Sequence, residues 1–600
     1  MLQPEKKTDY NTLIGFILIT VVLLWFSNNQ VKNNINENNK SKIIIPDTNN
    51  KSTSVKSSDN LSSDIRNNSE IKVFKNYTTD LLEEQYFLEN DLIKVSFTNI
   101  GGKINGIFIK NHKNFMREPL NLINKDSSDF NLAFFYENQK VETSKLYFVP
   151  SHEENSNIES LSMRFDVSED KYIEFRYSLP RNSYNLDCQI NIINLEDYIK
   201  KGSEFDYIVD ISLPRLELNK KNELYNSGIY FFNENDLKYL STSKNEDNKI
   251  INNPDWVAMK YQYFSAVILT EKFPNNIFIK TKEINESEKF LRQNTFKTKF
   301  VASGRNENIN FTWYFVPNHL KTLKKINKNL ENLVPLGWSL IGWINEYIVI
   351  NIFYFFESMG LGYGLIIFLM ALIIKIALFP FTYKSYVSMA KMRILKPQID
   401  LINEKFKDPL KKQQETMSLY RKTGVSPLGG CIPIFFQMPI LFALFQFFPA
   451  AIELRQKSFL WADDLSTYDS ILNLGFNIPF YGDHVSLFTL LMTVSTMIQM
   501  RFSNMNTSNS QMPQLKYMMY FMPIVFLGVM NNYAAALSYY YFLANLMTFA
   551  QQKAASFMID DSKLIAKMEE NKLKSPKTKS KFQARLEKMI KDQQNLKKPK

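Results

Sequence analysis

The sequence predicts a mixed architecture: an α-helical polytopic membrane domain with six transmembrane helices, five of which form its core, and an antiparallel β-sandwich outside the membrane. Long apolar runs are concentrated between residues 361 and 550. Residues 71–325 instead alternate apolar and polar side chains, as half-buried strands do. The net charge of +12 is concentrated in a few segments between the apolar runs. That distribution allows the runs to be oriented.

The N-terminal region predicts a membrane anchor followed by a linker. Residues 11–27 are mostly apolar and follow Lys6 and Lys7, a pattern shared by signal peptides and anchors. No small-x-small cleavage pattern follows, which favours an uncleaved transmembrane anchor behind a cytoplasmic N-terminus, 1–10. Residues 28–70 are rich in Asn, Ser and Lys and therefore predict a disordered linker.

Residues 71–325 predict the outer domain. The stretches "LIKVSFTNIGG", residues 92–102, and "YIEFRYSLP", residues 172–180, place apolar side chains at every second position. Such strands bury one face and leave the other wet. Because turn residues separate them over the whole segment, we expect an antiparallel β-sandwich and not a parallel α/β sheet.

Five apolar segments predict the membrane domain, 361–552. A further segment, 335–358, is interrupted by Asn345, Glu346 and Asn351, and we interpret it as an amphipathic helix in the outer interface. The last three spans are shorter than the roughly 20 residues that cross a bilayer core, and such a mismatch thins the membrane locally. The predicted spans are 361–383, 432–452, 485–500, 515–530 and 533–549.

Charge orients these spans. Residues 382–430 carry ten Lys and Arg against four Asp and Glu, and residues 551–600 carry fourteen against six. Residues 452–484 carry two against five. Positive loops stay inside, so we expect both termini, a helical hairpin at 384–425 and a basic tail at 553–600 in the cytoplasm. The large domain then lies outside.

One charge stands within an apolar run. Lys375 interrupts "LIIFLMALIIKIALFPF", although a lysine at the centre of a membrane helix costs about 2.5 to 3.5 kcal/mol on insertion scales. Its stem could snorkel toward the cytoplasmic face, or its charge could face a wet cavity inside the bundle. The sequence alone leaves both interpretations open.

Polar residues follow helical spacing on other spans, which indicates a shared hydrophilic groove with Lys375. Packing between helices through small hydroxylated residues is the alternative interpretation. The candidate groove residues are Lys375, Gln437, Thr489, Thr493, Thr496, Tyr541, Asn545 and Thr548. On the predicted hairpin, Met389, Met392 and Met417 could form a flexible surface for apolar client segments, or they could be ordinary core residues.

No catalytic, metal or cofactor constellation is recognisable. Cys188 and Cys431 fall in different predicted compartments, so no disulfide framework is expected. The four histidines lack metal-ligand spacing, and "GGK" at 101–103 lacks the spacing of a phosphate loop. We therefore expect a protein that is not an enzyme, with no cofactor, no metal and no small-molecule substrate.

Four segments in order carry a family resemblance: "SMAKMRILKPQI", "LYRKTGVSPLGGCIPIFFQMPILFALF", "IELRQKSFLWADDLS" and "YYYFLANLMTFAQQ". They resemble the YidC/Oxa/Alb family of membrane protein insertases. "FTNIGGKI" and "DWVAMKYQYFSAV" resemble, more weakly, the large periplasmic domain of its Gram-negative form. The resemblance implies an inner-membrane chaperone that inserts and folds newly made membrane proteins, alone or beside the Sec translocon.

The same resemblance implies roles for single residues. Lys375 falls where many members carry a groove arginine, Gln437 falls at a polar groove position, and Tyr541 falls where the last span contacts substrate. A lysine in place of arginine keeps the charge but loses the planar fork that binds a carboxylate through two hydrogen bonds. The basic tail resembles tails that approach the ribosome, although its composition suits RNA and anionic lipid equally.

Two other functions fit parts of the pattern. Polar stripes and an intramembrane cation also suit a solute transporter or channel, which typically shows paired internal repeats that this chain lacks. An enzyme that uses the outer domain as its catalyst is the third interpretation, since carboxylates are plentiful there. No motif singles out such a site.

Overall fold

The computed structural model describes residues 82–573 apart from 137–138, 156, 272, 275, 286, 305, 427–428, 430–431 and 505–512. The predicted anchor, 11–27, the linker, 28–70, and the end of the tail lie outside the described residues. The chain divides into two compact units, which meet in the sequence between Val334 and Pro335. Each unit is described separately below.

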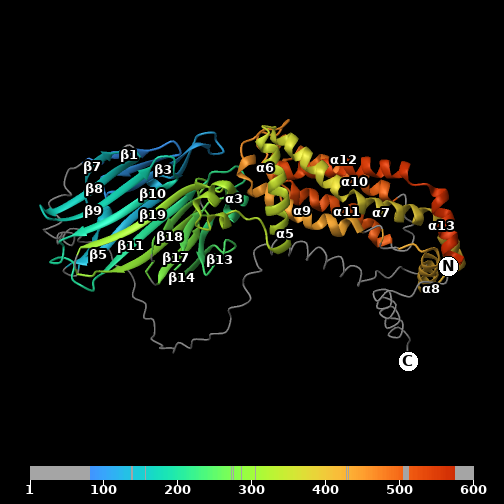
Figure 1. Cartoon of the computed structure of the whole chain (residues 1–600), viewed down its shortest axis with the longest axis horizontal. Coiled ribbons are helices and arrows are strands. Elements are labelled where there is room, and N and C mark those ends of the chain that lie inside the picture. Colours follow the sequence, from blue (N-terminus) through green and yellow to red (C-terminus); the bar gives the residue numbers. More distant parts are fainter. Residues whose placement is uncertain are drawn as a thin grey trace, which may run out of the picture. The chain divides into compact units, whose positions relative to one another are not determined.

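The first unit is built on two antiparallel sheets (Figure 1). The nine-stranded sheet has the order β13 (Asp236–Tyr239), β12 (Gly228–Asn233), β15 (Trp256–Lys260), β16 (Phe264–Leu269), β19 (Glu307–Pro317), β10 (Asn185–Ile193), β9 (Lys171–Pro180), β8 (Ile158–Ser168) and β7 (Val149–Glu154). The six-stranded sheet has the order β14 (Glu246–Ile251), β17 (Ile277–Glu283), β18 (Phe290–Val301), β11 (Glu204–Pro214), β5 (Ser128–Tyr136) and β6 (Gln139–Glu142).

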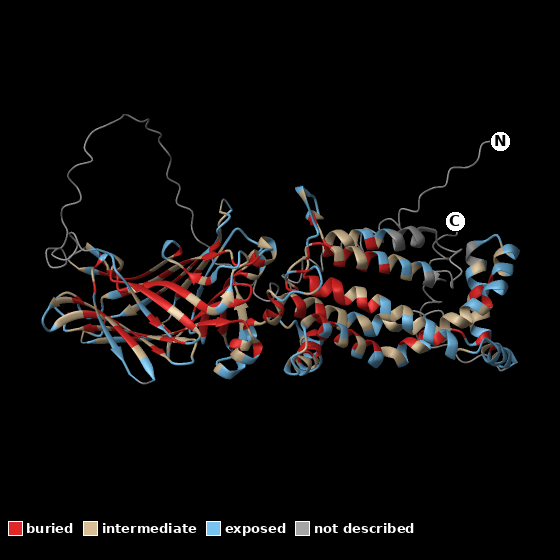
Figure 2. Cartoon of the chain, turned by 90° about the horizontal axis from the view of Figure 1, so that it is seen from above, coloured by how far each residue is buried: buried red, intermediate tan, exposed pale blue. Residues whose placement is uncertain are grey.

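Aromatic side chains join the two sheets into a sandwich. Trp313 on β19 meets Phe130 on β5 edge to face, with ring centroids 5.8 Å apart. Phe311, also on β19, stacks on Tyr207 of β11 at 4.7 Å. Because alternate residues of each strand face inward, these rings are buried while polar side chains stay outside (Figure 2). The predicted antiparallel sandwich is confirmed.

A third, four-stranded sheet covers part of the nine-stranded one. Phe97 on its second strand packs against Tyr177 of β9, with ring centroids 4.5 Å apart. Tyr177 also donates its hydroxyl to the carbonyl of Gly102 at 2.8 Å. The strands are β1 (Gln85–Glu89), β2 (Ile93–Thr98), β3 (Lys103–Lys113) and β4 (Pro119–Ile123), all antiparallel.

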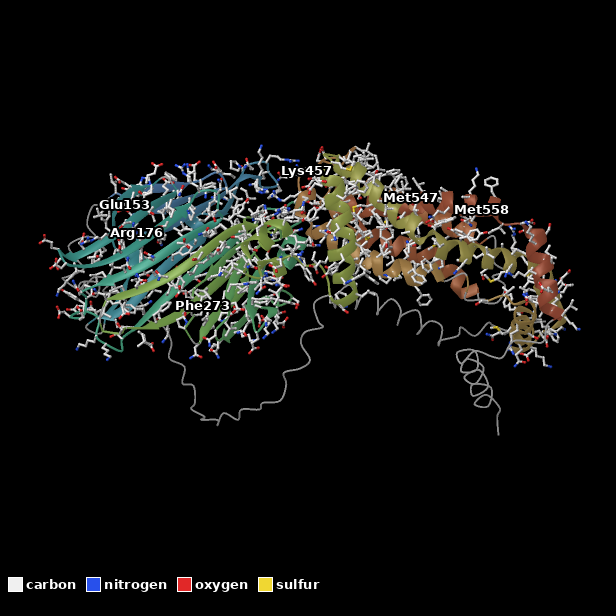
Figure 3. All side chains as sticks on the ribbon, in the orientation of Figure 1. Glu153, Arg176, Phe273, Lys457, Met547 and Met558 are labelled. Atoms are coloured by element: carbon white, nitrogen blue, oxygen red, sulfur yellow. The ribbon has the colours of Figure 1, made fainter. Side chains whose placement is uncertain are left out.

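On the wet face of the sandwich, charged side chains pair across strands. Arg176 of β9 donates to Glu153 of β7 at 2.8 Å (Figure 3). The described part of this unit also contains two short α-helices, α3 (Lys220–Asn226) and α4 (Leu320–Ile326). Leu330 and Leu333, which follow α4, are buried against Trp256. The unit therefore extends past the predicted limit at residue 325.

The second unit is helical. Its helices are α5 (Ser339–Ile344), α6 (Ile350–Ser358), α7 (Tyr363–Lys405), α8 (Pro409–Thr423), α9 (Ile432–Ala450), α10 (Leu487–Asn504), α11 (Pro513–Met530), α12 (Ala535–Met558) and α13 (Asp561–Leu573). A π-helical turn, Asn345–Val349, connects α5 to α6. A hairpin of β20 (Leu472–Ile478) and β21 (Gly482–Val485) lies between α9 and α10 in the chain.

Helix α7 differs from the prediction. The sequence pattern ends a span at residue 383 and starts a separate hairpin helix, whereas one helix runs from Tyr363 to Lys405 with Pro380 and Pro397 inside it. The change from apolar to charged side chains marks a change of surroundings, but the helix continues through it, although each of the two prolines removes one backbone hydrogen bond. The first arm of the hairpin is thus a direct extension of the helix that carries Lys375.

Two helical segments of the described chain are long and apolar enough to cross a membrane, Ser339–Ser358 and Tyr363–Lys405. Phe435–Ala450 and Phe521–Met530 are shorter apolar helical segments. Helix α12 has 24 residues, longer than its predicted span of 533–549. The additional residues lie beyond the apolar span, at the start of the predicted tail.

The segment from α5 to α6 also differs from the reasoning that predicted it. Figure 1 shows this segment crossing the direction of the bundle. Asn345, expected on a wet face, is fully buried and donates to the carbonyls of Leu336 at 2.7 Å and Ala443 of α9 at 2.8 Å. The exposed face instead carries Trp343 and Tyr347. The polar residues of this segment thus do not share one face: Asn345 lies inward among apolar side chains, whereas Asn351 is exposed.

The start of the predicted basic tail is ordered, contrary to a wholly flexible tail. Helix α12 continues to Met558, which projects from its end (Figure 3). Helix α13 follows and buries Met568 in an apolar cluster with Leu395 and Ile399 of α7 and with Val425. The sequence pattern did not predict this helix because charged residues dominate it and, of its described residues, Met568 alone is buried.

Candidate functional site

Lys375 lies where three helices of the second unit meet. Its side chain is only 5% exposed, and its Nζ donates to Thr548 Oγ1 of α12 at 2.9 Å. Gln437 Oε1 of α9 lies 3.5 Å from the same nitrogen, at the limit of a hydrogen bond. Three of the eight candidate groove residues are thus brought together, from α7, α9 and α12.

The partners of Lys375 are neutral. In the part of the chain that the structure describes, no carboxylate forms an ion pair with it. A hydroxyl and an amide oxygen solvate the ammonium group without cancelling its charge, and an ammonium has more N–H donors than these two contacts use. The arrangement therefore leaves the ammonium group inside the bundle with polar partners and, among the described residues, no charged one.

Sequence reasoning missed a fourth residue at this point. Gln551 of α12 donates its Nε2 to the backbone carbonyl of Lys375 at 2.7 Å. Its Oε1 is buried and has no hydrogen-bond partner within the described ranges. A buried acceptor without a partner is uncommon. Gln551 follows Thr548 by three residues, so helical periodicity could have identified it.

A second polar contact joins α12 to α10. The Asn545 amide donates to Thr496 Oγ1 at 2.8 Å and to Ser495 Oγ at 2.9 Å. Asn545 precedes Thr548 by three residues and therefore shares its helix face. Polar side chains of the two predicted stripes are thus in direct contact here, which both the groove and the helix-packing interpretations allow.

Thr489 and Thr493 lie apart from Lys375. Thr489 Oγ1 contacts Ser538 Oγ of α12 at 3.0 Å, and Ser538 lies ten residues, or about 15 Å, before Thr548 along that helix. Within the described residues, Thr493 donates to the carbonyl of Thr489 in its own helix, at 2.8 Å. These residues extend the polar stripe toward the other end of α12 without contacting the lysine.

Tyr541 belongs to an aromatic cluster. Its ring centroid lies 6.1 Å from that of Phe445 on α9 and 6.1 Å from that of Phe526 on α11. The cluster joins α9, α11 and α12 through edge-to-face contacts. Tyr541 is thus placed by aromatic packing, and Met547 lies further along α12 (Figure 3).

The hairpin methionines have different surroundings. Met392 packs against the cluster that contains Leu395 and Met568, as a core residue does. Met389 lines a cavity of about 140 Å³ together with Arg393 and Asp561. Met417 is half-buried on α8. Only Met389 therefore faces an open space at the base of the hairpin.

Family comparison agrees with both units. Residues 85–350 match the YidC periplasmic domain family, and residues 354–562 match the 60Kd inner membrane protein family. These two matches define the class: an inner membrane protein that carries a periplasmic domain. The β-sandwich corresponds to the first match and the helical unit to the second.

Curated relatives cover most of the chain. The membrane protein insertase YidC of Bacteroides fragilis is 37% identical over 85% of this chain and 84% of its own length. That of Parabacteroides distasonis is also 37% identical, over 98% of both chains. A crystal structure of an active YidC insertase, at 18% identity, covers 79% of this chain and 93% of its own, with a TM-score of 0.33. The chain belongs to the YidC family of membrane protein insertases.

This membership establishes the general function. The protein is a membrane protein insertase of the inner membrane, its substrates are nascent membrane proteins, and it works among membrane lipids. Its relatives are insertases and are not named as enzymes or as transporters.

Proposed function

We propose that Lys375 attracts the leading polar segment of a client and that the polar stripe of α10 and α12 carries the segment across the membrane. The observation behind this proposal is the set of neutral partners, Thr548 and Gln437, around a buried ammonium group. A lysine neutralised by a carboxylate would have little attraction left for an acidic client segment. Among the described residues, no carboxylate neutralises Lys375.

The proposal includes six spans with both termini in the cytoplasm. Helices α7, α9, α10, α11 and α12 supply five spans, and residues 11–27 supply the first. The basic balance of residues 382–430 and the acidic balance of 452–484 support this orientation. The stripe from Thr548 through Asn545 to Ser538 then leads from the level of Lys375 toward the periplasmic face.

No nucleotide is needed in this scheme. Transfer of the client's apolar helix into lipid drives insertion, and the membrane potential contributes about 2.3 kcal/mol for each charge moved through 100 mV. Polar side chains of the stripe replace part of the water that a translocating segment loses.

The cytoplasmic hairpin, α8 and the end of α7, would receive the client first. Since α7 is continuous, a client held at Met389 is only fourteen residues, or about 21 Å, from Lys375 along one helix. The Sec translocon would share part of the work, and the basic residues after Leu573 would approach the ribosome. Truncation after Leu573 that leaves ribosome co-sedimentation unchanged would remove the ribosome from this scheme.

Reconstitution tests the central step. The purified full chain is placed in liposomes without nucleotide or Sec components, and a short single-span client with an acidic leading segment is added. Protease protection of the client's translocated end measures insertion. The variants are Lys375→Met, which keeps the length of the side chain without its charge, and Lys375→Arg, which keeps the charge.

We expect Lys375→Met to lose most insertion of the acidic client and Lys375→Arg to retain it. The matched control is Lys384→Met, which removes an exposed lysine from the same helix. A second client with a neutral leading segment should respond less to Lys375→Met. Equal protection with wild type and Lys375→Met would show that the charge does not act on clients. Addition of the Sec translocon to the same liposomes measures how much it contributes to client insertion.

A further inference from the structure

The hairpin of β20 and β21 exposes apolar side chains that the described chain does not cover. Phe476 is 63% exposed and Phe480 is 92% exposed, and Ile471, Leu472 and Ile478 are also exposed. A two-stranded hairpin is marginally stable in water unless another surface covers an apolar face. The hairpin therefore needs a partner surface.

The base of the hairpin is rigid. His484 is 3% exposed, stacks on Tyr468 with ring centroids 3.7 Å apart, and contacts the carbonyl of Asn531 through Nε2 at 2.8 Å. The Asn531 amide donates in return to the carbonyl of His484 at 2.8 Å. Asn532 donates to the carbonyl of Tyr481 at 2.7 Å. The exposed tip is thus held at a defined place beside the end of α11.

The tip of the hairpin lies at the end of the exposed face of α11. A side-chain carbon built on Gly528 would lie 3.3 Å from the carbonyl oxygen of Phe480. Phe521 and Ile524, each 52% exposed, precede Gly528 by seven and four residues and so share its helix face. Phe480 therefore sits at the last turn of α11, directly beyond an apolar face that α11 presents outward.

The composition of the hairpin agrees with a lipid surface. From Ser470 to Gly482 the sequence "SILNLGFNIPFYG" contains no charged residue, whereas Asp469 and Asp483 stand just outside it. Tyr is enriched at the boundary between hydrocarbon and water, exposed Phe and Leu side chains suit its apolar side, and charged side chains are costly deeper in the bilayer.

We propose that this hairpin is a membrane anchor: its tip, with Phe476 and Phe480, inserts into the headgroup region of the outer leaflet beside α11. The inference goes beyond the insertion mechanism and rests on the proposed placement of α11 in the membrane. The anchor would hold the loop between α9 and α10 at the lipid surface, next to the outer end of the polar stripe at Thr489 and Ser538.

Collision measurements on a spin label test the anchor. In the full chain, Cys188 and Cys431 are replaced by Ala, one cysteine is placed at 480 or 476, and a nitroxide is attached. The protein is put into nanodiscs of phosphatidylethanolamine and phosphatidylglycerol, one copy per disc. Oxygen, which concentrates in lipid, and a water-soluble nickel chelate compete to relax the label.

Two further label positions calibrate the oxygen-to-chelate collision ratio. Position 524 on α11 is the lipid reference, and position 250 on β14, where Ile250 is 61% exposed, is the water reference. We expect the oxygen-to-chelate collision ratio at 480 and 476 to lie several-fold above that at 250 and toward that at 524. Phe480 has a φ of 67°, a conformation that non-glycine residues rarely adopt, so a substitution there could change the local backbone. Position 476 therefore provides an independent measurement.

Other results would overturn the anchor. Ratios at 480 and 476 equal to that at 250 would place the tip in water. Protection from both reagents would mean that protein covers the tip, and dipolar coupling between labels at two copies per disc would identify a second copy as the cover. A water-like ratio at 524 would instead show that the placement of α11 in the membrane is wrong. The two failures are thereby distinguished.

Discussion

The Nζ of Lys375 lies 2.9 Å from Thr548 Oγ1, so that the charge of one helix is solvated by a hydroxyl of another. Thr548 in turn donates its own proton to the carbonyl of Ala544 at 2.7 Å. Its oxygen is therefore oriented to accept from the lysine. This contact links the start of the membrane domain, α7, to its last helix, α12.

Thr548→Val should weaken this link. Valine keeps the shape of the side chain and removes the acceptor, and loss of a buried hydrogen bond to a charged group costs about 1 to 3 kcal/mol. We expect a lower unfolding temperature in detergent and reduced client insertion. For the unfolding temperature, Thr493→Val is the control, because among the described residues that hydroxyl donates to a carbonyl of its own helix. Equal effects of the two variants would contradict a special role for Thr548.

Met568→Ala should release α13 from the hairpin. Met568 is 3% exposed in the cluster with Leu395, Ile399 and Val425, and truncation of a buried methionine costs about 2 to 5 kcal/mol. The ion pair between Arg393 and Asp561 is half-exposed and adds little. Hydrogen exchange of α13 should rise sharply. Ile565→Ala, on the exposed side of α13, should leave exchange near the wild-type rate.

Asn345→Ala should loosen the segment from α5 to α6 on α9. The variant removes two buried hydrogen bonds, to Leu336 and Ala443, and we expect a loss of about 1 to 3 kcal/mol. Faster cleavage of the chain between the two units in limited proteolysis would measure this loss of stability. Asn351→Ala is the matched control, because the Asn351 amide is exposed and donates to carbonyls of its own helical segment. Similar cleavage of both variants would argue against the contact with α9 as the cause.

Lys260 makes the stability of the periplasmic unit depend on pH. Burial lowers the pKa of this lysine from 10.5 to about 8. Between these values the unfolded chain binds more protons than the folded one, so stability rises with pH through that window and does not change on this account below it. Lys260→Met should abolish the rise.

Urea unfolding of the full chain in detergent, followed by tryptophan fluorescence at about pH 7.5 and about pH 10, measures this difference. Lys282→Met, which removes an exposed lysine of β17, should keep the wild-type slope. A rise that persists in Lys260→Met would assign the pH dependence to other groups.

Periodicity predicted the sandwich well, because an alternating strand has one apolar face wherever it lies. In β9, Ile173, Phe175, Tyr177 and Leu179 are buried as the pattern indicates. Composition was a weaker guide near the helical boundaries. It ended a helix at residue 383, where α7 continues, and it missed α13.

The sequence by itself determined the family, the two-unit organisation, the polar faces of α10 and α12, and the presence of a charge in an apolar helix. Only the tertiary structure decided which of these groups meet. Helical spacing specifies the face on which a side chain lies but not the neighbour that the face packs against. Thr548 and Gln437 therefore surround Lys375, whereas Thr489 binds Ser538 and Tyr541 packs among aromatic rings.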